Sequence, residues 1–246
     1  MHLFFYKLSM FGLGLRNSEN DYVTGEKAFI RFLKSRKLLQ SGVILDIGAN
    51  VGHYSTMLRN SNVTLPIYAF EPHPLTYLKL KVIAQERNFT PVCLGAGDAS
   101  SESVIYDYNG QGGSEHASMY KEVIETLHHG LAEEIRISMT TLDEFAATNK
   151  INKIALLKID TEGHERNVLR GATNTIKAGI IDVIQLEFNE MNVISKTFFK
   201  DIIDLLPNYD FFRLLPDGPL SLGTYHPVHY EIFCFQNIVA VRKGLC

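Results

Sequence analysis

Two segments near the start of the chain combine acidic residues with glycines at spacings that suit ligand binding. Residues 43–55 read VILDIGANVGHYS, an apolar run that carries Asp46 and then turns through Gly48 and Gly52. A second apolar run, residues 67–70, is followed directly by Glu71. Strand, glycine turn, helix, strand and acid occur in this order in the nucleotide-binding half of a doubly wound α/β fold.

The residues of the glycine turn discriminate between cofactors. A dinucleotide turn needs Gly-x-Gly-x-x-Gly so that backbone amides can approach a pyrophosphate, and Asn50 stands here in place of the middle glycine. Asp46 would repel a diphosphate but suits a ligand with an ammonium and a sulfonium, which is S-adenosylmethionine. Glu71 is then expected to bind the ribose hydroxyls, and the helix after Gly52 to face the ligand's carboxylate. The alternative is a tight strand-to-helix connection that binds no cofactor.

A second constellation, residues 158–165 with the sequence KIDTEGHE, follows a predicted buried strand. In open α/β sheets, ligands bind beyond the carboxyl ends of the strands. Ionisable side chains crowded at that edge are expected to perturb one another's pKa values, as is common in active sites. The alternative is a charged helix N-terminus, because Glu162 and Glu165 favour the first turn of a helix. The two readings are compatible.

These segments and others in series resemble the FkbM family of S-adenosylmethionine-dependent methyltransferases, and the resemblance extends from about residue 25 to residue 242. The matching motifs are LDIGANVG at 45–52, AFEP at 69–72, TLDEF at 141–145, LKIDTEGHE at 157–165 and LRGA at 169–172. The resemblance implies a class I methyltransferase fold, which is Rossmann-like and doubly wound, with a mostly parallel seven-stranded sheet and a terminal antiparallel strand. It also implies O-methylation of a hydroxyl, often on a sugar of a surface glycan or on a natural product.

The motif residues and the resemblance together give the expected ligand contacts. The expected S-adenosylmethionine contacts are Asp46, Gly48, Asn50, Gly52, Glu71, Gly97, Asp98 and Asp160. The turn at residues 95–98 departs slightly from the family's form, and adenine contacts are expected there. Residues 106–129 match the family loosely and are predicted to form an irregular substrate loop. The expected acceptor contacts are Glu162, His116 and Ser118.

Methyl transfer from a sulfonium needs alignment of the acceptor oxygen, the methyl group and sulfur, and a base that takes the hydroxyl proton. Asp160 is the first candidate base because it ends the strand nearest the expected methyl position. His164 is an alternative with an ordinary pKa better matched to neutral pH. Glu187 is a third candidate, or it orients a substrate hydroxyl. Lys158 is expected to pair with Asp160 or Glu162 and to hold them ionised.

Other chemistries fit less well. The oxygen and imidazole groups of Asp160, Glu162, His164 and Glu187 do not form a recognisable ligand set, so no divalent metal is expected. Asn50 and the position of Asp46 argue against a nicotinamide oxidoreductase. A catalytically silent methyltransferase-like binding module in a glycan-assembly complex is the remaining alternative. It would be expected to have a damaged cofactor motif, whereas the motif here is intact.

Composition limits the possible partners and the compartment. The 246 residues carry a net charge of -3 and are 46% hydrophobic, which suits one α/β domain and gives no electrostatic case for nucleic-acid binding. Cys93, Cys234 and Cys246 are widely spaced and form no CxxC. A reducing, cytoplasmic location is therefore expected, with a small-molecule or glycan acceptor as partner.

Residues 1–40 are predicted to be an N-terminal extension with an amphipathic helix at 25–40, followed by the cofactor-binding domain at 41–246. Residues 1–13 are apolar but shorter than a membrane span. They are expected to pack on the domain or on a neighbouring chain, and the alternative is a weak anchor at a membrane surface. Further strands are predicted at 91–96, 154–160, 181–188, 211–215 and 238–242, and helices at 54–60, 75–86, 142–147, 167–178 and 197–206.

Overall fold

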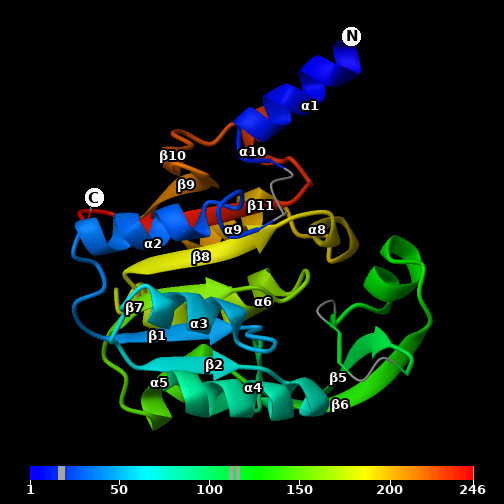
Figure 1. The fold of residues 1–246 in the computed structure, drawn as a ribbon, viewed down its shortest axis with the longest axis vertical. Helices are drawn as coiled ribbons and strands as arrows, with labels where there is room; N and C mark the ends of the chain where they lie inside the picture. Colours follow the sequence, from blue (N-terminus) through cyan, green and yellow to red (C-terminus); the bar gives the residue numbers. More distant parts are fainter. Residues whose placement is uncertain (16–19, 111–112, 115–116, 246) are drawn as a thin grey trace.

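A central, mostly parallel β-sheet with helices on both faces organises the chain (Figure 1). The computed structural model describes residues 1–15, 20–110, 113–114 and 117–245. The strand order is β10-β9-β11-β8-β7-β1-β2-β3. The strands are β1 (Val43–Ile47), β2 (Ile67–Phe70), β3 (Thr90–Val92), β7 (Ile154–Ile159), β8 (Val183–Phe188), β9 (Tyr209–Leu215), β10 (Gly218–Ser221) and β11 (Gln236–Arg242).

The doubly wound α/β architecture expected from the sequence is confirmed. Strands β3, β2, β1, β7 and β8 are parallel, and β11 runs antiparallel between β8 and β9. The sheet has eight strands in place of the expected seven, because a tight turn returns the chain from β9 into the edge strand β10. Parallel strands that are buried on both faces consist of nearly continuous apolar residues, and this pattern allowed them to be predicted from the sequence.

Two apolar clusters fill the spaces above and below the sheet. One contains side chains of α2 (Glu26–Ser35), α3 (His53–Asn60) and α4 (Pro74–Arg87). The other contains side chains of the helices on the opposite face, which are α5 (Leu142–Thr148), α6 (Glu165–Arg170), α7 (Thr173–Lys177) and α9 (Phe199–Leu205). In place of the single helix expected at 167–178, the chain forms the two short helices α6 and α7. The helix expected at 25–40 is α2, which ends at Ser35.

Two residues of the TLDEF motif have structural roles at the starts of α5 and α7. The backbone N–H of Glu144 donates to the Thr141 hydroxyl at 3.1 Å, so Thr141 caps α5. The Asp143 carboxylate accepts the backbone N–H of Thr175 at 2.8 Å, in the first turn of α7. These contacts give Thr141 and Asp143 of the TLDEF motif roles in the fold.

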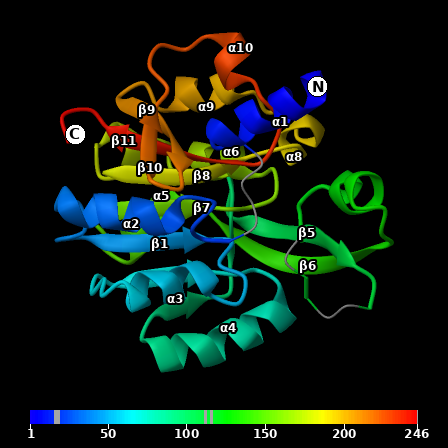
Figure 2. The same cartoon turned by 45° about the horizontal axis from the view of Figure 1, so that its top comes forward.

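A second, three-stranded sheet stands beside the carboxyl ends of the central strands (Figure 2). It has the order β4 (Gly95–Ala96), β6 (Ala132–Thr140), β5 (Ser101–Tyr108). The strand predicted at 91–96 is thus divided, because the chain leaves the central sheet after Val92 and Gly95 pairs with β6 instead. The predicted irregular loop is largely the far end of the β5–β6 hairpin, with one π-helical turn, η1 (Val123–Leu127).

Three short helices lie outside these layers. They are α1 (His2–Gly12), α8 (Met191–Ile194) and α10 (Pro227–Tyr230). Helix α1 projects beyond the edge of the sheet, and Met10 is its single buried residue (Figure 1). The expected packing of residues 1–13 on the domain is therefore confined to the end of this helix. Within the described ranges, no helix has the length and apolar character needed to cross a membrane.

Gly171, in the LRGA motif, marks a close backbone approach that can be tested. A Cβ at this position would overlap the Gly97 carbonyl oxygen and lie 2.9 Å from its carbonyl carbon. The φ of -70° is ordinary, so the cost of a side chain is steric. We expect Gly171→Ala to lower the free energy of unfolding by about 1–3 kcal/mol, measured by urea denaturation. Gly12→Ala, where a Cβ meets nothing within 4 Å, is the control, and an equal loss in both variants would contradict this account.

Candidate active site

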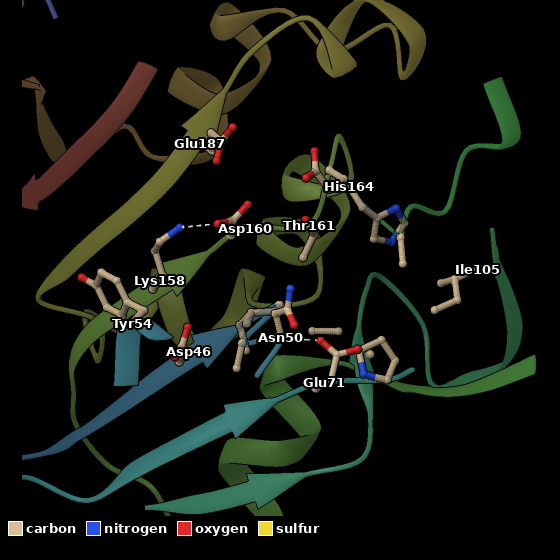
Figure 3. A pocket seen from close by; sticks show the side chains of 18 of the residues that line it. Asp46, Asn50, Tyr54, Glu71, Ile105, Lys158, Asp160, Thr161, His164 and Glu187 are labelled. Atoms are coloured by element: carbon tan, nitrogen blue, oxygen red, sulfur yellow. Dashed lines mark hydrogen bonds and ion pairs between the residues drawn. The ribbon is translucent and has the colours of Figure 1, made fainter. Parts of the chain in front are cut away.

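The register of three central strands brings polar side chains into rows. Asp46 on β1 lies opposite Lys158 on β7, which in turn lies opposite Gln185 on β8. All three are buried in a sheet that is otherwise apolar at this level. Residues two positions on share the same face of a strand, so Asp160 and Glu187 form a second row at the carboxyl edge, as seen in Figure 3.

The glycine turn after β1 permits a close approach of β1 and β7. Gly48 has φ of +78°, and a Cβ there would overlap the carbonyl oxygen of Asp160. The backbone N–H of Asp160 donates to the Ile47 carbonyl at 2.9 Å, which fixes the same contact from the other side. Gly52 has φ of +88° and directly precedes α3. Both glycines thus meet a backbone requirement, and Gly48 sets the acidic end of β7 against the turn.

Glu71 joins the turn after β1 to the end of β2. Its two carboxylate oxygens accept the backbone N–H groups of Asn50 at 3.0 Å and of His73 at 2.8 Å. Asn50 reaches this position with φ of +49°. Burial raises the pKa of Glu71 to about 7 in spite of these two hydrogen bonds. Each oxygen retains a further lone pair for a donor in the cavity.

Asp46 is more deeply enclosed. Its Oδ2 accepts a hydrogen bond from the Ser55 hydroxyl at 2.6 Å, and its side chain is almost fully buried. Burial raises the pKa of Asp46 to about 6, while the Ser55 hydrogen bond and the charge of Lys158 act in the opposite direction. The carboxylate therefore lies near its titration midpoint at mildly acidic pH.

Lys158 provides the positive charge at the centre of this site. Its Nζ lies 2.9 Å from Oδ2 of Asp160, so of the two predicted partners it is Asp160 that pairs with it. Burial alone would lower the pKa of Lys158, but the charges of Asp160 and Glu26 outweigh this effect and raise the pKa. Lys158 is thus held as an ammonium ion.

A buried hydrogen-bond network that the sequence did not reveal lies beside this lysine, whose Nζ is 5.6 Å from the centre of the Tyr54 ring. The Tyr54 hydroxyl donates to Oε1 of Gln185 at 2.6 Å. Nε2 of Gln185 donates to Glu26 at 2.9 Å and to Asn237 at 3.1 Å. Gln185 and Glu187 are two apart in an apolar strand, which was a usable signal for a polar face. Nothing in the local sequence around Glu26 indicated that α2 begins beside these strands.

The loop after β7 is organised by Glu165. Its Oε1 accepts the backbone N–H groups of Thr161 and Gly163, each at 3.1 Å, and its Oε2 accepts the Asn192 side-chain amide at 3.2 Å. Glu165 is the first residue of α6, as expected for an acid in a first turn, but it is buried beneath the loop. It therefore shapes the loop that carries Glu162 and His164.

His164 is a poor candidate for the base. Burial lowers its pKa to about 4, with the Asp98 charge opposing the shift. Its Nδ1 lies 3.2 Å from the Asn167 amide nitrogen; if that amide donates, the proton of the neutral imidazole is on Nε2. A neutral histidine of this tautomer presents a donor, and not an acceptor, from Nε2. Burial thus moves the pKa of His164 away from the ordinary value that made this residue an alternative base.

Between the two sheets lies a cavity of ≈ 560 Å³. Asp46, Gly48, Asn50 and Glu71 line it on one side, and Lys158, Asp160, Glu162, His164 and Glu187 on the other. The β5–β6 hairpin and β4 contribute Leu94, Ala96, Ile105, Ala117, Met119, His128, Ile137 and Met139. The described part of residues 1–40 contributes Asp21 and Glu26. The cavity thus has acidic groups along the strand ends and a mostly apolar wall on the hairpin.

Several predicted contacts lie elsewhere. Gly52, Gly97 and Asp98 are outside this lining. The Gly97 N–H donates to the Thr140 carbonyl, and Oδ2 of Asp98 lies 3.6 Å from Arg170. From the segment where adenine contacts were expected, Ala96 and the preceding Leu94 line the cavity instead. Ser118 is also outside the lining; it is buried and its hydroxyl donates to the Glu162 carbonyl at 2.8 Å. It fastens the hairpin to the loop after β7. His116 falls outside the described residues.

A second contact fastens the hairpin to the central domain. His73 caps α4 by accepting the backbone N–H groups of Leu75 and Thr76 on Nδ1. Its Nε2 therefore carries the proton and lies 3.5 Å from Oδ2 of Asp107 on β5. Both side chains are buried. Because the backbone N–H of His73 also binds Glu71, the hairpin is joined directly to the acid at the end of β2.

A family comparison matches residues 46–212 to the methyltransferase FkbM domain. The chain belongs to the FkbM methyltransferase family. The hexuronic acid methyltransferase AglP of Haloferax volcanii is 25% identical over 164 residues, which is 66% of this chain and 62% of that relative. The 31-O-demethyl-FK506 methyltransferase FkbM of Streptomyces tacrolimicus is 25% identical over 213 residues, covering 76% and 79% of the two chains.

The fold agrees with this family. A crystal structure of an FkbM methyltransferase from Methylobacillus flagellatus superposes with a TM-score of 0.50 at 13% identity. The match covers 96% of this chain and 59% of that one. The chain therefore spans a little under two thirds of both AglP and this structure. Among the described residues, no group of three His, Cys, Asp or Glu side chains is arranged to hold a metal ion.

The buried acids of this FkbM-family site predict a pH dependence of stability. For Glu71 the pKa rises from an ordinary 4.5 to about 7 on folding, so between these values the folded state binds more protons. Its contribution to stability is then greatest at low pH and decreases as pH rises toward 7. In the wild type we expect this effect to lower the free energy of unfolding by about 2–3 kcal/mol between pH 4.5 and 7. Glu71→Gln should abolish this decrease, which urea denaturation would measure. The exposed Glu86→Gln should change nothing, and equal pH profiles for wild type and Glu71→Gln would contradict the assignment.

Proposed function

We propose that this protein is an S-adenosylmethionine-dependent O-methyltransferase. The observation that carries the proposal is a single cavity lined both by the turn after β1 with Glu71 and by Asp160 and Glu187 at the ends of β7 and β8. The first group suits a nucleoside with a cationic amino acid end, and the second suits a hydroxyl that must lose a proton. Family membership supports methyl transfer as the reaction class.

The residues present fit the cofactor. Asp46 offers a buried carboxylate near the positive groups of the ligand, and Glu71 has a free lone pair on each oxygen for the ribose hydroxyls. Leu94, Ala96 and Met139 offer an apolar surface for the adenine ring. S-adenosylmethionine, when bound, supplies an electrophilic methyl group, and its product is S-adenosylhomocysteine. The other contributions to the reaction come from the chain.

Asp160 is the proposed base. Its Oδ2 is held by Lys158, which orients the carboxylate and leaves Oδ1 to accept the proton of the acceptor hydroxyl. Glu187, whose Oε1 accepts the Asn189 amide at 2.6 Å, orients the acceptor beside it. Burial raises the pKa of Glu187, and the charges of Asp160 and Glu162 raise it further. Glu187 is therefore suited to remain protonated and to donate a hydrogen bond.

The acceptor is proposed to be a hydroxyl of a sugar, in a surface glycan or a natural product. The names of two relatives support these acceptor classes, since one is a hexuronic acid methyltransferase and the other a 31-O-demethyl-FK506 methyltransferase. Glu162 borders the cavity beside the end of the hairpin, where an acceptor would enter. A cytoplasmic location is part of the proposal, in agreement with the free thiol of Cys93.

Cofactor binding gives the first test. We expect calorimetry to detect S-adenosylmethionine and S-adenosylhomocysteine and to detect no binding of NAD. Glu71→Ala should weaken S-adenosylhomocysteine binding by about 1–3 kcal/mol, because a buried polar partner of the ligand is lost. The exposed Glu86→Ala on the neighbouring helix is the matched control. Unchanged affinity in Glu71→Ala would remove Glu71 from the ribose site, and no binding by the folded wild type would favour a binding module without this cofactor.

Turnover gives the second test. Methyl transfer from labelled S-adenosylmethionine would be measured on hexuronic acid glycans, neutral glycans and 31-O-demethyl-FK506. We expect Asp160→Asn to reduce turnover by about 10²–10⁴, the usual contribution of a general base. The change in S-adenosylhomocysteine affinity should be much smaller. A larger loss of turnover in Glu187→Gln than in Asp160→Asn would transfer the role of base to Glu187.

A further inference from the structure

Helix α1 exposes apolar side chains on all of its sides. Leu3, Phe4, Phe5, Tyr6 and Leu8 are between 55% and 66% exposed. An α-helix has about 3.6 residues per turn, so four consecutive exposed residues, 3–6, already surround it. Along its length, HLFFYKLSMFG, the helix has one lysine and no acid. It thus lacks the polar face of an ordinary surface helix.

The end of α1 is fixed to the body of the protein. Leu15 is fully buried, and Gly14 lies so close to β9 that a Cβ would touch the Leu215 side chain. The buried guanidinium of Arg213 donates to the Leu13 carbonyl at 3.4 Å and to the His229 carbonyl at 3.2 Å. The helix therefore projects from a rigid attachment, as Figure 1 shows at the top of the molecule.

The distribution of apolar residues around α1 indicates what covers it. A protein surface or a second copy of the helix covers one side and would leave the opposite apolar side in water. Lipid acyl chains can contact a helix from every side. The 11 residues of α1 extend only about 16 Å, roughly half the hydrocarbon thickness of a bilayer. We propose that α1 inserts into one leaflet of a membrane and holds the protein at the lipid surface.

A single-tryptophan reporter tests the insertion directly, because the chain has no tryptophan. Phe5→Trp places the indole on α1, and Phe198→Trp places it on the body at the same exposure of 55%. We expect the emission of Phe5→Trp to shift to the blue on addition of phosphatidylcholine vesicles, and that of Phe198→Trp to stay unchanged. No shift for Phe5→Trp, or equal shifts for both, would overturn the proposal.

Vesicle flotation of the full chain gives the strength of binding. Phe4→Ser/Phe5→Ser is expected to weaken partition into phosphatidylcholine vesicles by about tenfold or more. Leu78→Ser/Val82→Ser, which removes two similarly exposed apolar side chains from α4, should bind as the wild type does. Binding that requires phosphatidylglycerol would overturn insertion as the main interaction, because Lys7 is the one charged side chain of α1.

Self-association is the competing outcome. A wild-type dimer by light scattering that becomes a monomer in Phe4→Ser/Phe5→Ser, with no vesicle binding, would make a second copy the occupant and overturn the proposal. The same double variant should bind S-adenosylhomocysteine like the wild type, since α1 contributes nothing to the described lining of the cavity. Membrane insertion is thereby tested independently of the proposed methyl transfer.

Discussion

The buried ammonium of Lys158 is the constraint around which the centre of the sheet is arranged. A charge taken out of water is costly unless it is paired, and Lys158 lies in the middle of a parallel sheet with apolar neighbours along its strand. Asp160 pairs with it directly, Glu26 adds its charge from α2, and Gln185 lies opposite it on β8. Helix α2 and strands β7 and β8 must therefore meet in this arrangement, which is also the arrangement that gathers the acids of the cavity.

The second sheet makes an open strand edge into an enclosed site. A doubly wound sheet offers a crevice at the carboxyl ends of its strands, but the crevice needs a further wall to exclude water. Here the β5–β6 hairpin supplies apolar side chains for that wall and is attached at two places. Ser118 holds the loop after β7, and Asp107 faces His73 beside Glu71. Each half of the cavity thus has its own contact with the hairpin.

The sequence predicted those features that depend on short segments. Gly48, Glu71 and Asp160 directly follow strands that are mostly apolar, and Asp46 is the one acid within its strand, so these residues are visible locally. The network of Glu26, Tyr54 and Gln185 joins residues up to 159 positions apart, and no local pattern contains it. The second sheet was missed for a similar reason. Its strands are recognised by pairing across a hairpin, and Ser118 looks like any loop serine until Glu162 is beside it.

The raised pKa values of Asp46 and Glu71 connect the fold to the proposed ligand. Burial of these carboxyls favours their neutral forms. A ligand with a positive charge beside Asp46 would favour the ionised form, so binding of the ligand and release of the proton are linked. Ribose hydroxyls donate to an ionised Glu71 more strongly than to a neutral one. Burial of these carboxyls is therefore an unfavourable feature of the site that the proposed cationic nucleoside would relieve and that a diphosphate would increase.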